Sequence, residues 1–132
     1  MDIISKNSKI ICIIYRADNW IKGLNFITPE NLFIQVGSWW YDKGKVLDSH
    51  IHNYLERKAD RTQEMVYVVS GRMKVLLFNE DKSFISEYIL NKGDLAIFAY
   101  GGHGYVILEK DTKIVEAKNG PFIDVLSDKT KF

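Results

Sequence analysis

Short runs of β-branched and aromatic residues, separated by turn residues, follow one another along almost the whole chain. The clearest runs, with glycine or polar turns between them, are Lys9–Tyr15, Glu64–Ser70, Arg72–Phe78, Ser83–Leu90, Leu95–Tyr100 and Thr112–Lys118. Runs of this length and composition are typical of β-strands, and their regular spacing is typical of a sandwich or a barrel. No convincing amphipathic helix interrupts them. The sequence therefore predicts an all-β fold.

The middle of the chain carries a further pair of candidate strands. The segment Asn31–Gly44 alternates and is rich in aromatic residues, and Lys45–His52 is predicted to continue as a strand after a turn at Gly44. The segment Asn53–Gln63 has few apolar positions and is predicted to be a loop. With 132 residues the chain is expected to form a single domain, residues 1–132, that ends in a polar tail, residues 118–132.

Charge and apolar patterning narrow the classes of partner. The chain has 18 basic and 17 acidic residues, so nothing in its net charge favours nucleic acid or an anionic membrane surface. The single cysteine, Cys12, cannot form a disulfide within the chain. The apolar stretch Ile10–Ile14 is too short for the core of a signal peptide, and no run approaches the length of a membrane helix. These features favour a soluble, cytoplasmic protein.

The three histidines lie where a strand ends or a turn begins. Residues two apart on a strand face the same way, so His50 and His52 would project from one face, about 7 Å apart. Glu64 begins a candidate strand, and His103 lies among glycines in "YGGHGY". Imidazole and carboxylate groups together suit a divalent transition metal. The histidine pair alone is equally compatible with a surface or hydrogen-bonded role.

The spacing of these residues resembles the sequence motifs of the cupin superfamily. In the first motif a glycine is followed by five residues, His-x-His, a glutamate, six residues and a second glycine. Here these positions are Gly44, His50, His52, Glu64 and Gly71, with eleven residues between His52 and Glu64. The second motif places a histidine after a glycine-containing turn, which corresponds to "GDLAIFAYGGH" ending at His103. The matched motifs and the strand spacing around them span residues 44–117.

The resemblance implies a double-stranded β-helix, which is a jelly-roll barrel. It also implies one divalent metal ion, such as Zn, Fe, Mn or Ni, bound by His50, His52, Glu64 and His103. The eleven-residue insert would then lie at the mouth of the barrel. Short sequence segments of the chain also resemble those of small cupins found among bacterial surface-polysaccharide and nucleotide-sugar genes.

Three functions are consistent with such a fold. The first is a metal-dependent enzyme, of the isomerase or epimerase type, that acts on a small carbohydrate-related molecule; Fe(II)-dependent dioxygenase chemistry is its variant. The second is a cupin that binds a small ligand without turnover, and the third is a barrel whose histidines bind no metal. No catalytic residue is assigned. The expected substrate-binding side chains are Tyr67, Tyr100, Tyr105, Arg57 and Arg61.

A homodimer is also expected, because cupins often protect an exposed sheet edge by pairing. The apolar run Ile10–Tyr15 is the candidate strand for that exchange.

Overall fold

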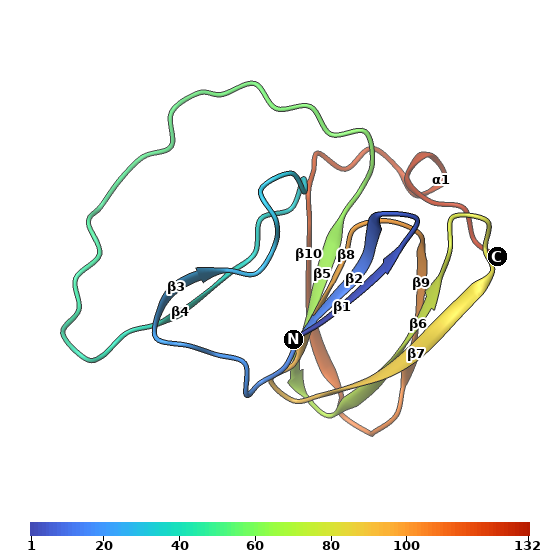
Figure 1. Ribbon diagram of the computed structural model, residues 1–132, viewed down its shortest axis with the longest axis horizontal. Coiled ribbons are helices and arrows are strands. Elements are labelled where there is room, and N and C mark those ends of the chain that lie inside the picture. Colours follow the sequence, from blue (N-terminus) through green and yellow to red (C-terminus); the bar gives the residue numbers. More distant parts are fainter.

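The computed structural model describes residues 1–132 and is built almost entirely from antiparallel strands in three sheets (Figure 1). The largest sheet has the order β1-β2-β8-β5-β10, the second has β7-β6-β9, and β3 pairs with β4 alone. The strands are β1 (Asp2–Lys6), β2 (Lys9–Tyr15), β3 (Gly23–Phe26), β4 (Gly37–Trp40), β5 (Glu64–Ser70), β6 (Arg72–Phe78), β7 (Phe84–Asn91), β8 (Leu95–Phe98), β9 (Gly102–Ile107) and β10 (Lys113–Lys118). A single helical turn, α1 (Val125–Asp128), lies in the tail.

The large sheet is buried on both faces at its centre. Every residue of β8 is buried, and its side chains alternate between two hydrophobic clusters. Ala96 and Phe98 belong to the cluster that the second sheet covers, whereas Leu95 and Ile97 belong to the cluster on the opposite face. A strand that is apolar at every position requires cover on both sides, and this requirement arranges the molecule in layers.

The two covers come from different parts of the chain. One cover is the β7-β6-β9 sheet, whose inward residues Met73, Val75, Leu77 and Leu90 are at most 2% exposed. The other is the stretch around the β3–β4 hairpin, which contributes Ile27 and Leu32 to the second cluster. The first cover matters most for function, because the site described below lies where this packing between the two sheets ends.

Residues 41–63, here called the arm, contain no helix or strand. Figure 1 shows them as a wide arc that leaves the sheets after β4 and returns only at the start of β5. The arm is exposed from Tyr41 to Arg61, including Ile51 at 88% and Tyr54 at 94%. A structureless segment of this length is uncommon in a compact domain.

Buried amide groups hold the end of the arm against the sheets. The Gln63 side chain is 1% exposed, and its oxygen accepts hydrogen bonds from the backbone N–H groups of Phe33 (2.7 Å) and Ile34 (3.2 Å). The Gln63 backbone N–H donates to Asn119 Oδ1 (2.6 Å), and the Asn119 backbone N–H donates to the Gln63 carbonyl oxygen (3.2 Å). Glu64 therefore starts β5 at a defined position.

The all-β prediction is confirmed, but none of the three sheets closes into a barrel. The strands predicted over Lys9–Tyr15 and Arg72–Phe78 have the observed bounds, and the predicted loop Asn53–Gln63 contains no regular structure. The strand predicted over Lys45–His52 is wrong, because this segment lies beside no other strand that could satisfy its backbone groups.

The expected exchange of Ile10–Tyr15 between two chains finds no support in the sheet order. This run lies in β2, which pairs with β1 on one side and with β8 on the other. It therefore offers no free edge to a partner; the outer edges of the sheet belong to β1 and β10. No helix of the structure has both the length and the apolar character needed to cross a membrane.

The turn before β9 yields a stability prediction. Gly101 has φ +71°, and a Cβ added there would clash with the carbonyl oxygen of Phe78. We expect Gly101→Ala to lower the free energy of unfolding by at least about 2 kcal/mol, from left-handed strain and overpacking. Urea denaturation measures this change. The matched control is Gly104→Ala, whose Cβ would meet nothing closer than 3.9 Å, and equal losses in both variants would contradict the packing described here.

Candidate functional site

A cluster of three polar side chains lies at one end of the core between the two larger sheets. Glu64 begins β5 and points to the same face as Val66 and Val68, which are core residues of the first cluster. His103 and Tyr105 lie two apart on β9, opposite Leu77 and Val75 of β6. Both sheets thus direct polar groups to the place where their apolar packing stops.

The contacts within this cluster centre on one carboxylate oxygen. Glu64 Oε1 lies 2.8 Å from Nε2 of His103 and accepts a hydrogen bond of 2.8 Å from the Tyr105 hydroxyl. The other oxygen, Oε2, has no hydrogen-bond partner within the chain. Since Glu64 also lines the neighbouring cleft, this oxygen is the one left for a ligand.

Phe98 forms the floor of the cluster. It pairs with Glu64 across β8 and β5, and the His103 ring stacks on it at 4.3 Å between ring centroids and 29° between planes. Tyr105 meets the same ring edge-on, at 5.8 Å. The aromatic floor is apolar and holds the imidazole in one orientation, so the polar edges of Glu64 and His103 face the same space.

The electrostatics of Glu64 follow from these contacts. Burial by itself raises the pKa of Glu64, whose residue is 6% exposed. The hydrogen bond and positive charge of His103, with the hydrogen bond from Tyr105, outweigh burial and lower the pKa from 4.5 to about 2. Burial and the charge of Glu64 raise the pKa of the Tyr105 hydroxyl, which therefore stays protonated and can only donate.

A broad open cleft of about 1350 Å³ lies in front of the cluster. Its walls come from the end of the arm, the turn before β9 and the C-terminal tail, and its rim carries Arg61, Tyr100, Lys82, Lys118 and Asn119. Arg61 lies over the Tyr100 ring, 4.7 Å from the centroid, and pairs with Asp60 and Glu80. The cleft therefore combines aromatic surface with hydrogen-bonding and charged groups, as small-molecule sites commonly do.

The structure brings together only part of the predicted site. Glu64 and His103 are in contact, and Tyr100, Tyr105 and Arg61 line the cleft. Tyr67 instead packs against the second hydrophobic cluster, on the opposite face of β5 from Glu64, and does not line the cleft. Arg57 is exposed on the arm and takes part in no ion pair.

His50 and His52 lie on the exposed arm. Their ring centroids are 5.1 Å apart, and Nδ1 of His50 lies 3.1 Å from the Asp48 carbonyl oxygen. Nowhere does the structure gather three or more histidine, cysteine, aspartate or glutamate side chains in a group that could hold a metal ion. One chain thus keeps the four expected ligands in two separate pairs.

The Glu64–His103 contact is a hydrogen bond between a carboxylate and an imidazole. Nε2 and Oε1 lie 2.8 Å apart. Two ligands of a tetrahedral zinc-type ion would lie roughly 3.4 Å apart. The pair supplies only two of the four expected ligands.

Some residues that build this site carry no obvious sequence pattern. Gln63 and Asn119 hold the start of β5 in place by hydrogen bonds between residues that are far apart in the chain. Phe98 stacks on His103, but in the sequence it looks like any other apolar residue of a buried strand. The alternation of Glu64 with Val66 and Val68, in contrast, places the carboxylate on the inward face and is visible in the sequence.

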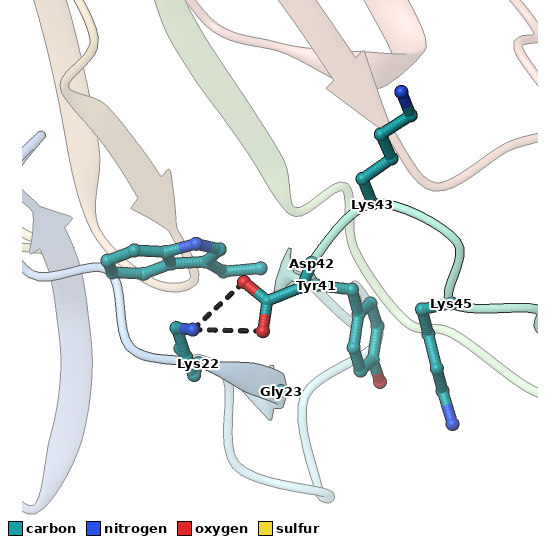
Figure 2. Close-up of a pocket in the computed structure, with 7 residues that line it drawn as sticks. Lys22, Gly23, Tyr41, Asp42, Lys43 and Lys45 are labelled. Atoms are coloured by element: carbon teal, nitrogen blue, oxygen red, sulfur yellow. Dashed lines mark hydrogen bonds and ion pairs between the residues drawn. The ribbon is translucent and has the colours of Figure 1, made fainter.

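A second, smaller hollow of about 260 Å³ lies beside the β3–β4 hairpin (Figure 2). Lys22 Nζ lies 2.9 and 3.0 Å from the two carboxylate oxygens of Asp42, and it is 5.9 Å from the centroid of Trp40. Both charged groups are largely exposed and satisfy each other. This hollow has no buried polar group directed into it, and the cleft at Glu64 remains the candidate site.

Comparison of the chain with protein-family models, with curated proteins and with solved structures found no match.

The low pKa of Glu64 predicts a specific pH dependence of stability. A carboxylate whose pKa falls on folding stabilises the protein above its unfolded pKa, and this contribution is lost as the pH falls through the folded value. With values of 4.5 and about 2, we expect ionised Glu64 to contribute about 3 kcal/mol that disappears between about pH 5 and about pH 2.

Chemical denaturation of wild type and Glu64→Gln at several pH values measures this contribution. The difference in unfolding free energy between the two should shrink by about 3 kcal/mol on acidification, since other carboxylates titrate alike in both proteins. A difference that stays constant over this pH range would show that Glu64 titrates normally.

Proposed function

We propose that the protein is an enzyme of the isomerase or epimerase type, acting on a small carbohydrate-related molecule bound in the cleft beside Glu64 and His103. The observation that carries the proposal is the buried Glu64 carboxylate in contact with an imidazole that faces the cleft. A charged group is rarely withdrawn from water without a partner, and such perturbed groups in clefts mark functional sites more often than other surfaces do.

The contacts assign different roles to the three polar side chains. Because its pKa is about 2, Glu64 is an anion at neutral pH and is a weak base. Its role is to orient the neutral His103 ring on Phe98 and to stabilise the imidazolium that forms when this ring takes up a proton. His103 is then the group that accepts a proton, while the protonated Tyr105 keeps the carboxylate in place.

Isomerisation requires a proton to leave and return. His103 would take a proton from the carbon next to the substrate carbonyl, and the electron pair of that C–H bond would form an enediolate. Return of the proton to the former carbonyl carbon, with the hydroxyl proton passing to the carbonyl oxygen, isomerises the sugar. Epimerisation requires instead that a second donor protonates the opposite face of the same carbon. No oxidant or reductant is consumed in either case.

The rim of the cleft suits a ligand with many hydroxyl groups or a negative charge. Lys82, Lys118 and Asn119 offer donors. Arg61 lies over the Tyr100 ring and pairs with Asp60 and Glu80, so it adds a positive charge to the same rim.

The cupin resemblance belongs to the same proposal, together with the double-stranded β-helix and a divalent metal. Because the structure gathers no three of the expected ligands in one place, no chemical step is assigned to a metal.

Solvent exchange tests the proposal without knowledge of the exact substrate. Proton transfer next to a carbonyl should introduce deuterium from D₂O into reducing sugars or into nucleotide sugars that carry a ketone, and mass spectrometry of a panel of such compounds would detect it. We expect His103→Ala and Glu64→Gln to lower the exchange rate at least about 100-fold. The matched control is Glu109→Gln, an exposed partner of Arg72 outside the cleft, which should retain wild-type exchange.

Other results would point to other functions. Saturable binding of a panel compound with no deuterium uptake would favour a ligand-binding protein without turnover. Oxygen consumption that requires added Fe(II) would favour a dioxygenase. Exchange that is unchanged in His103→Ala would exclude the proposed base.

A further inference from the structure

A lysine lies in the same row of side chains as Glu64. On the large sheet β5 lies between β8 and β10, and Glu64 pairs with Phe98 on one side and with Lys118 on the other. Residues directly opposite each other on antiparallel strands point to the same face, with Cβ atoms roughly 5 Å apart. Phe98, Glu64 and Lys118 therefore form one row across the sheet, and its last member, Lys118, lines the cleft.

The two ends of this row differ in what covers them. The His103 ring stacks on Phe98 and the Tyr105 ring meets Phe98 edge-on, so both rings lie over that end. The other end is more open, because the Lys118 side chain is 31% exposed, compared with 8% for Glu64. A molecule in the cleft would thus have the imidazole on one side of the Glu64 carboxylate and the ammonium on the other.

Glu116 holds the Lys118 ammonium. Glu116 Oε1 lies 3.0 Å from Lys118 Nζ, and the two side chains share a face because they are two residues apart on β10. The hydrogen bond to Glu116 and the charge of that carboxylate raise the pKa of Lys118, which is therefore a cation at neutral pH. An ammonium has three N–H donors. Only one of them is used here, so the other two are available to a ligand.

The Lys118–Glu116 pair also acts electrostatically on the cluster around Glu64. Against the effect of burial, His103 and Tyr105 lower the pKa of Glu64, and the positive charge of Lys118 adds to their effect. Burial and Glu64 raise the pKa of Tyr105, and the charge of Glu116 adds to that shift. Lys118 is therefore part of the site and differs in this respect from an isolated surface lysine.

The proposed proton transfer creates a negative charge beside one that is already present. When His103 takes the proton from carbon, the electron pair of the carbonyl double bond moves onto the carbonyl oxygen, in a cleft that Glu64 also lines. The Glu64 carboxylate would repel this oxygen. A fixed positive donor at the place where the charge develops offsets the repulsion, and such donors contribute strongly to catalysis.

We infer that Lys118 is a catalytic residue that donates a hydrogen bond to the substrate carbonyl oxygen and stabilises the negative charge of the enediolate. This inference rests on the proposed function, because it assigns the group that acts together with His103 in the same reaction. Lys118 keeps its proton throughout, so no further reactant is needed. Glu116 is a positioning residue, since it acts on the substrate only through the Lys118 ammonium.

Substitution of Lys118 tests the inference through the rate of deuterium uptake from D₂O. We expect Lys118→Met to lower kcat at least about 100-fold, which is the usual loss when one donor to an oxyanion is removed. KM should change less, because the charge that Lys118 meets develops after the substrate has bound. Lys118→Arg keeps a charged donor and should exchange at least about tenfold faster than Lys118→Met.

The matched control is Lys113→Met, which removes another lysine of β10 that does not line the cleft. This variant should keep the wild-type exchange rate. Urea denaturation of each variant shows whether the chain is folded, and Lys118→Gln serves as a second neutral variant if Lys118→Met is not.

The outcomes separate this inference from the proposed function. A compound that the wild type and both neutral variants exchange equally fast would overturn the role of Lys118 and leave the proposed function standing. Equal, slow exchange by Lys118→Met and Lys118→Arg would overturn the role of the charge. If the wild type exchanges no compound of the panel, the proposed function fails, and this inference fails with it.

Discussion

The burial of β8 on both faces is the constraint on which the arrangement of this molecule depends. Its four residues are all apolar, and they belong alternately to two separate hydrophobic clusters. One face requires the β7-β6-β9 sheet and the other requires the stretch around β3 and β4, so the layers follow from one short strand. Phe98, the last residue of β8, stacks against His103, which lines the cleft.

The polar groups of the site lie at the end of the core between the two larger sheets. Glu64 is paired beside Phe98 and is nearly excluded from water, so its charge must be met by donors from the opposing sheet. His103 and Tyr105 supply these donors because β9 presents alternate residues inward, in line with the core positions of β6. The aromatic floor, the anion and the imidazole thus form one unit. The arm, which holds the other two histidines, is the part of the chain that this packing leaves out.

Patterns that depend on local sequence were predictable, and those that depend on distant partners were not. Lys9–Tyr15 and Arg72–Phe78 are apolar runs between turn residues, and the structure gives them the predicted bounds. Glu64 and His103 were expected to share a site, and they are in contact. Lys45–His52 has the composition of a strand, but a strand forms only against a neighbour, which the sequence does not reveal. The burial of Gln63 could not be foreseen for the same reason, since its partners are backbone groups thirty residues earlier.

The most direct test is amide hydrogen exchange along the chain, because exchange reports how strongly each strand is held in the folded state. The amides of β8 should exchange among the slowest in the protein, since β2 and β5 flank this strand and all four of its residues are buried. The amides of the arm should exchange fastest. Amides of β8 that exchange as fast as those of the arm would contradict the burial of this strand on both faces.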